Sequence, residues 1–427
     1  MTNSVMSLRG LLRYVTLFAG LGALFVAGTL LHPQFLTIAN QRDVLAQVSI
    51  NGILAVGMTL VILTAGIDLS VGSVMSLCTV VCAMLLMERP DAGTTGVRWA
   101  TRAHDMLVPA LAVFAWLAVY GIVRRVARWR EWNALDGGIV LFGTLLVTAV
   151  ALACLPTRWL WGDGFTTLAV LLVVPVVGGM LGLVNGVIIA QTRLQPFIVT
   201  LAMMVAAVGL AKFIAGNGGQ IHAIYTGDAE HAGAPTSFEQ LGATILTVGQ
   251  ETLRTGRVRD LKLVPIPGLF LLGAWLWAAL VLRKLALGRY VFAVGGNEEA
   301  ARLAGVPVAG VKIFAYTACG VLAGLAAVLY CAQYTQGKAD AGQGKELDAI
   351  AAVVIGGTSL MGGRGSILGT LVGVMIFGYL TNILQLRAVS SEIQDILKGV
   401  IIVVAAVAQS GDLLGGLRHL WRRPARG

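Results

Sequence analysis

Apolar segments long enough to cross a bilayer as helices recur along the whole chain, and this feature leaves few alternatives to a membrane fold. A spanning helix needs about 20 mostly apolar residues, and several segments reach that length with no internal charge. Of the 427 residues, 57% are hydrophobic and 12% are charged, whereas a soluble domain carries about a quarter charged residues. The sequence therefore predicts an all-α, polytopic membrane protein.

About twelve transmembrane helices are expected in a single membrane domain that covers residues 1–427. The 54 glycines fit helices that pack closely through small residues. The predicted spans lie near residues 14–31, 44–64, 72–87, 107–123, 138–154, 166–190, 197–215, 265–282, 313–335, 347–361, 366–386 and 393–410.

The basic residues sit in short clusters beside apolar segments. A net charge of +10 would suggest nucleic acid in a soluble protein, but here the clusters are typical of signals that orient membrane insertion. Residues 124–130, 283–284 and 418–426 carry such clusters and are expected on the cytoplasmic side. Both termini are then cytoplasmic, the long polar segment 217–262 is an external loop, and nucleic acid is not an expected partner.

The mostly polar segment 283–312 contains a very short helix with both ends specified. Asn297 is a good N-cap, and Glu298 and Glu299 place negative charge in the first turn, where the helix dipole favours it. Gly305 supplies a left-handed stop, and Pro307 prevents the helix from continuing. About two turns of helix are not stable alone in water, so this helix needs a groove in which to lie.

This helix allows two interpretations. Ala300, Ala301, Leu303 and Ala304 give it a small, nearly flat apolar side that suits a groove on another protein. The alternative is an amphipathic connector on the bilayer surface, which is the commoner use of such segments. A surface helix would be longer and would carry Lys and bulky apolar residues, so the sequence favours docking on a partner.

Two glycine-rich breaks interrupt apolar sequence, near residues 65–73 and 356–366. Asp68 lies in the first break, and an ionisable group at such depth is costly and usually functional. A structural role is the alternative, in which Asp68 caps a helix that starts at Leu69. Paired breaks of this kind point to a substrate pathway. The alternative is a chance similarity between glycine-rich turns, and the second break carries two extra residues. The helix-break residues are Gly66, Gly72, Gly356, Gly357, Gly362, Gly363 and Gly365, and the pathway candidates are Asp68, Ser70, Ser73, Asn185, Thr358 and Ser359.

The sequence carries no pattern for catalysis. Residues 362–365 lack the Gly-Lys-Ser/Thr ending of a phosphate-binding loop, and no nucleophile stands beside a base. The five cysteines fall in apolar segments without a CxxC pair or acidic neighbours. An enzyme, a bound metal and a resident cofactor are therefore not expected.

Several of these motifs together resemble the permease subunits of the ribose/xylose/galactose branch of bacterial ABC importers. The matching stretches follow the family's order over most of the chain. They are Gly52–Met58, Gly66–Ser73, Leu183–Gly186, Pro196–Leu201, Ala293–Gly305, Leu347–Leu360 and Gly362–Ser366.

The resemblance implies a function and a set of partners. A member of this family carries a monosaccharide, a pentose or hexose such as xylose, ribose or galactose, across the bacterial inner membrane. It works with a cytoplasmic ATPase subunit that binds the ATP, a periplasmic sugar-binding protein and a second permease copy. Residues 283–312 would then be the cytoplasmic coupling loop and 217–262 a periplasmic loop. The coupling residues are Gly295, Gly296, Asn297, Glu298, Glu299, Ala300, Ala301, Arg302, Leu303, Ala304 and Gly305.

The chain departs from this family in one region. Family members usually have about ten spans, so residues 88–165 are interpreted as a two-helix insertion of unknown role. The alternative function is a self-sufficient secondary transporter, which twelve spans would also suit. Such transporters commonly couple to ions through intramembrane carboxylates or His, and the sequence offers little beyond Asp68. The sugar is not identified by the sequence.

Overall fold

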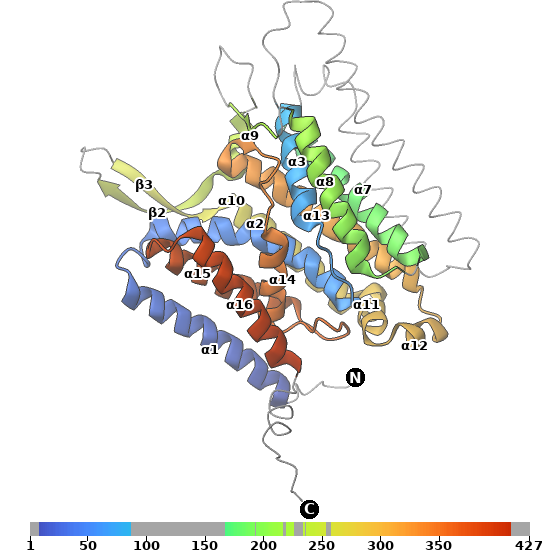
Figure 1. Cartoon of the computed structure of the whole chain (residues 1–427). Helices are drawn as coiled ribbons and strands as arrows, with labels where there is room; N and C mark the ends of the chain where they lie inside the picture. Colours follow the sequence, from blue (N-terminus) through green and yellow to red (C-terminus); the bar gives the residue numbers. More distant parts are fainter. Residues whose placement is uncertain are drawn as a thin grey trace, which may run out of the picture.

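Figure 1 shows the computed structural model of the chain. It describes residues 8–86, 167–192, 194–216, 219–225, 234, 236–252 and 258–410. The predicted insertion at 88–165, with its two spans, lies outside the described residues.

Most of the described chain is helical, as predicted. Six of the described helices are long and apolar enough to cross a membrane, namely α2 (Ile38–Leu63), α7 (Thr167–Thr192), α8 (Pro196–Ala215), α10 (Ile266–Lys284), α13 (Val308–Tyr334) and α15 (Ile367–Leu386). The other described helices are α1 (Leu8–Leu31), α3 (Val71–Leu86), α9 (Thr236–Gly242), α11 (Ala286–Gly296), α12 (Glu298–Leu303), α14 (Lys345–Ile355) and α16 (Ser391–Ser410). A polytopic helical protein follows from these helices, whereas the total of twelve spans stays a prediction.

Helix α13 is central to the packing. It is buried over most of its 27 residues and contacts α2, α3 and α7. Gly320 and Gly324 of α13 lie against Gly178 and Pro175 of α7 with backbone facing backbone, so that an added Cβ would overlap the opposite helix. Small residues thus permit the close helix approach that the glycine content indicated.

Four short strands depart from the all-α prediction. Strand β1 (His222–Ala223) pairs antiparallel with β4 (Gln336–Gly337), and β2 (Thr244–Thr252) pairs antiparallel with β3 (Val258–Pro265). The predicted loop 217–262 therefore contains most of a β-hairpin. Thr, Ile and Val, which favour strands, recur in β2 and β3, but the two strands lack the regular alternation of polar and apolar residues that would have predicted them.

The predicted span 347–361 is wrong. The structure has only α14 there, with 11 residues, and at 1.5 Å per residue it covers roughly half of a bilayer. Gly344 precedes α14 with a φ of 79°, and Gly357 follows it with a φ of 82°. Both values belong to the left-handed region that glycine adopts easily, so glycine marks each end of a half-length helix.

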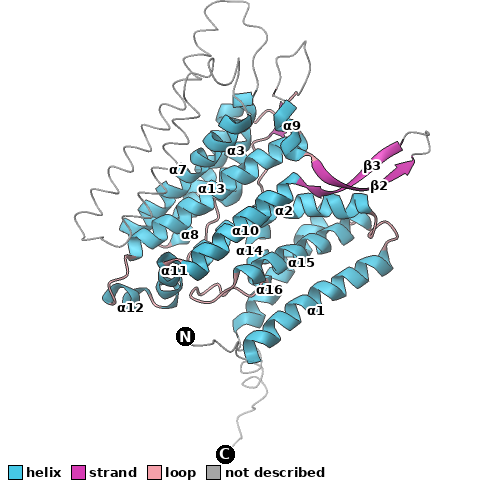
Figure 2. Ribbon diagram, turned by 180° about the vertical axis from the view of Figure 1, so that it is seen from behind, coloured by secondary structure: helices cyan, strands magenta, loops and turns pink. Residues whose placement is uncertain are grey.

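The coupling segment and the hairpin lie at opposite ends of the helices. Figures 1 and 2 show α11 and α12 beyond one end of the bundle and β2–β3 beyond the other. Helix α12 lies just before α13 in the chain and β4 lies just after α13, so the length of α13 separates α12 from β4.

Candidate functional site

The start of helix α12 forms as the sequence predicts. Asn297 has an extended backbone, and its side-chain oxygen accepts a hydrogen bond from the Ala300 N–H at 2.9 Å. Glu298 and Glu299 occupy the first turn. This arrangement satisfies one of the free N–H groups and places carboxylates at the positive end of the helix dipole.

The end of α12 is equally well specified. Gly305 adopts a φ of 78°, and its N–H donates to the Arg302 carbonyl at 3.0 Å. The Val306 N–H donates to the Ala301 carbonyl, also at 3.0 Å. These two bonds form a Schellman motif, which uses glycine to close a helix. The predicted stop at Gly305 is therefore confirmed.

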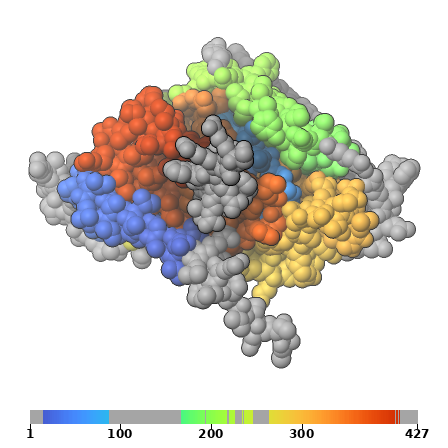
Figure 3. Space-filling model, turned by 60° about the horizontal axis from the view of Figure 1, so that its bottom comes forward, coloured from blue at the N-terminus to red at the C-terminus, as the bar shows by residue number. Residues whose placement is uncertain are grey.

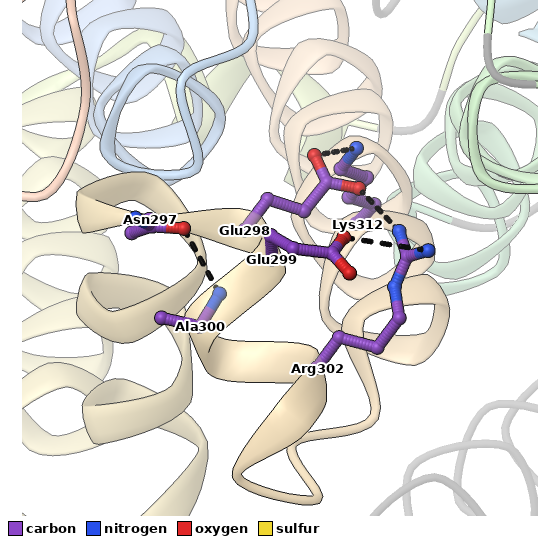
Figure 4. A network of polar contacts seen from close by, with 6 residues as sticks. All are labelled: Asn297, Glu298, Glu299, Ala300, Arg302 and Lys312. Carbon is purple, nitrogen blue, oxygen red and sulfur yellow. Dashed lines mark hydrogen bonds and ion pairs between the residues drawn. The ribbon is translucent and has the colours of Figure 1, made fainter.

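A charged network holds α12 against α13, as Figure 4 shows. Glu298 pairs with Lys312 of α13 at 2.7 Å, and Arg302 pairs with Glu298 at 3.3 Å and with Glu299 at 3.8 Å. Exposed ion pairs contribute little free energy, but the Lys312 side chain is only 15% exposed. Glu298 therefore fixes the direction in which this short helix points.

The apolar residues of α12 divide between two faces, which corrects the expected single docking side. Ala301 is 5% exposed and belongs to the core of this chain, whereas Leu303 is 82% exposed. Ala300 and Ala304 are exposed as well. Adjacent residues of a helix point about 100° apart, so Ala300 and Ala301 do not share a face. The surface left for a partner is formed by Glu299, Ala300, Leu303 and Ala304.

Gly295, at the end of α11, joins the coupling segment to both helix breaks. A Cβ at Gly295 would overlap the carbonyl oxygen of Leu63, the last residue of α2. That oxygen accepts a hydrogen bond from the Gly363 N–H at 3.0 Å. Gly362 and Gly363 adopt φ angles of 80° and 66°. We call Leu63, Gly295 and Gly363 the glycine junction, because three separate segments meet there through backbone.

Asp68 is buried in the first break and serves the turn before α3. Its Oδ1 accepts hydrogen bonds from the Ser70 N–H at 2.9 Å and the Ser70 hydroxyl at 2.6 Å. The Asn185 amide donates to the same hydroxyl at 2.9 Å. Helix α3 begins at Val71, two residues after the Leu69 start that the capping alternative assumed, so Asp68 does not occupy the N-cap position. The carboxylate thus organises the break through Ser70.

The other pathway candidates lie mostly inside the protein. Ser73, Asn185 and Thr358 are 6%, 0% and 0% exposed, and only Ser359 is partly exposed. Their contact with substrate stays a prediction, since in this structure they present almost no surface to a ligand.

The helix-break glycines do have a packing role. A Cβ at Gly66 would overlap the Tyr316 hydroxyl, one at Gly356 would overlap backbone of Gly369, and one at Gly365 would lie 2.6 Å from Thr358. A Cβ at Gly72 would overlap the carbonyl oxygen of Gly342. The breaks therefore depend on glycine because other backbone or side chains approach closely.

Sequence reasoning missed a further interruption, between α13 and α14. Residues 335–344 form no helix and consist of strand β4 followed by turns. They contain Gly337, Gly342 and Gly344 among charged and amide side chains. Three glycines within eight residues, between two apolar segments, were the available signal. Among the described residues, no group of three or more His, Cys, Asp or Glu side chains could hold a metal ion.

Comparison with known proteins shows the family of the chain. Residues 41–406 match the family described as the branched-chain amino acid transport system / permease component. The chain belongs to this permease family. The ribose import permease RbsC of Escherichia coli K12 is 36% identical over 384 residues, which are 89% of this chain and 88% of that protein. No solved structure matches the chain.

Two further relatives have different named sugars. The fructose import permease FrcC of Rhizobium meliloti is 30% identical over 90% of this permease and 81% of its own length. The xylose transport permease XylH of Escherichia coli K12 is 30% identical over 87% of this chain and 84% of its own length. The resemblance drawn from the motifs is thereby confirmed.

Proposed function

We propose that this permease carries a monosaccharide across the bacterial inner membrane as the transmembrane subunit of an ABC importer, with ATP hydrolysis on a separate chain. The observation that carries the proposal is the match to the ribose import permease over almost the whole of both chains. Relatives named for fructose and xylose import support a pentose or hexose as substrate. The permease itself is then a transport subunit and not an enzyme.

Helix α12 is the proposed docking element for the ATPase subunit. Its caps and its Glu298–Lys312 pair keep it folded and oriented without a partner. Its exposed face offers the apolar side chain of Leu303 beside small residues. A helix laid into a groove is a common recognition mode. The glycine junction at the end of α11, the helix just before α12, gives the coupling segment its backbone contact with both breaks.

The orientation follows from the basic residues. Arg283 and Lys284 end α10 next to the coupling segment, and short basic loops favour the cytoplasmic side. The hairpin end would then face the periplasm and the sugar-binding protein. Large apolar side chains on α8, including Phe197, Val205 and Phe213, are exposed, which suits contact with lipid or with a second permease copy.

Uptake by proteoliposomes tests the function. The permease is reconstituted with the ATPase and the sugar-binding protein of its transport system, and radiolabelled ribose, xylose, galactose and fructose are offered. We expect accumulation of at least one sugar that requires ATP on the ATPase side and survives collapse of ion gradients by an ionophore. Uptake by the permease alone that an ionophore abolishes would instead identify a secondary transporter.

A further inference from the structure

The backbone between α13 and α14 runs unwound along a membrane helix. After β4, the Lys338 carbonyl accepts from the Thr79 hydroxyl at 2.9 Å, and the Gly342 N–H donates to the Ser76 hydroxyl at 2.8 Å. Gly342 then packs against Gly72. Thr79, Ser76 and Gly72 follow one another along α3, so this segment descends roughly 10 Å beside that helix.

The segment ends near the middle of the membrane. The Lys345 ammonium donates to Asn51 Oδ1 at 2.9 Å, and Asn51 is the fourteenth of the 26 residues of α2, which begins at Ile38. A charge at the midpoint of a spanning helix is costly and usually functional. Unwound backbone at this depth occurs where it is buried in protein or lines a water-filled cavity.

Several polar groups of the segment are open to the surface. Gln343 and Asp340 are exposed, and Lys345 and Glu346 are partly exposed. Asp340 is paired with Lys338 at 3.1 Å, and Asp348, one turn further along α14, is paired with Lys398 at 3.3 Å. The free amide of Gln343 thus lies beside charged groups that the fold holds in place.

The surface is hollowed between the C-terminal helices and helices α7 and α8. Figure 3 shows a recess between the red helices α15 and α16 and the green helices α7 and α8, with orange and blue residues set back in it. Helix α14 contacts both α16 and α3, and the segment that leads into it is hydrogen-bonded to α3 through Ser76.

We infer that residues 340–346 contact the sugar during its passage, with Gln343 as the main hydrogen-bonding side chain; this rests on the proposed function. Each sugar hydroxyl can donate and accept, and the Gln amide supplies both an acceptor and two donors. Glu346 packs its carboxylate against Gly72 and closes the segment on α3. Lys345, held by Asn51, is a positioning residue that keeps the segment at this depth. The buried Asp68, Ser73 and Asn185 then shape the break behind it.

Sugar selectivity of the reconstituted importer tests this inference. Gln343→Ala should lower uptake of the preferred sugar about tenfold, as expected for a lost hydrogen bond in a partly dehydrated site. It should also change the ratio of uptake rates between ribose, xylose and fructose. Binding of the ATPase should be unchanged. The matched control is Gln385→Ala, an exposed glutamine at the end of α15, and it should leave the rates and their ratios unaltered.

A thiol at the same position provides a second readout that does not depend on the loss of an amide. Gln343→Cys should react with a water-soluble, charged thiol reagent, and the preferred sugar should slow that reaction during turnover. The described native cysteines are buried, and a reagent-treated wild type gives the background. Normal rates and ratios for Gln343→Ala, or reaction of Gln343→Cys that sugar never slows, would overturn the inference. Absence of ATP-driven uptake in the wild type would instead reject the proposed function.

Discussion

Replacing Gly295 by Ala should abolish most ATP-driven uptake, whereas the same change at the neighbouring Gly296 should have little effect. A Cβ at Gly295 would overlap the Leu63 carbonyl oxygen, while a Cβ at Gly296 meets nothing within 4 Å. The obstructing atom is backbone, and that oxygen also accepts the Gly363 N–H at 3.0 Å. The clash therefore separates α11 from both helix breaks.

The expected sizes follow from packing and helix propensity. Forced overpacking costs about 1–3 kcal/mol, and loss of the junction should reduce uptake by about tenfold or more. Gly296→Ala removes a flexible residue from a helix end and should be neutral or stabilising by up to about 1 kcal/mol. Uptake and thermal stability are measured at matched amounts of inserted permease. Equal uptake by the two variants would show that the junction does not transmit motion.

Replacing Leu303 by Asp should release the ATPase subunit while leaving the permease folded. Leu303 is 82% exposed, so its side chain contributes little to the fold of this chain. Burying a leucine in a partner's groove contributes about 1.5–3 kcal/mol, so a charge there should weaken binding by roughly tenfold to a hundredfold. Co-purification of the ATPase with the solubilised permease measures this loss.

Leu303→Met is the matched control, because it conserves apolar character and nearly conserves volume. It should retain the ATPase. Ala301 is unsuitable for such a test because it is buried within the permease, and a large residue there would disturb the permease itself. If the Asp variant binds the ATPase as well as the Met variant does, α12 is only a connector.

Short-range signals explain what the sequence could predict. The limits of α12 depend on Asn297 and Gly305, whose effects act within one turn, and both were found as expected. The faces of that helix depend on tertiary contact with α13 through Lys312. No local pattern shows which face of α12 packs against the rest of the chain, so the sequence alone does not separate Ala301 from its exposed neighbours.

The glycine junction and the unwound segment exceeded what the sequence could predict for a related reason. Hydropathy reports which residues avoid water, but it does not report where backbone hydrogen bonds go. The residues near 347–361 are apolar enough for a span, yet Gly344 and Gly357 confine α14 to 11 residues. Leu63, Gly295 and Gly363 meet only because the fold brings distant segments together.

Site-specific photocrosslinking tests the central claim most directly, namely that α12 is the contact with the ATPase. A photoreactive residue is placed at Leu303, and for comparison at Ile221, which is 51% exposed beside β1 at the other end of α13. Irradiation is done in membranes that contain the ATPase and the sugar-binding protein. We predict an ATPase adduct from position 303 and none from position 221. An ATPase adduct from position 221 with none from position 303 would contradict both the docking site and the orientation.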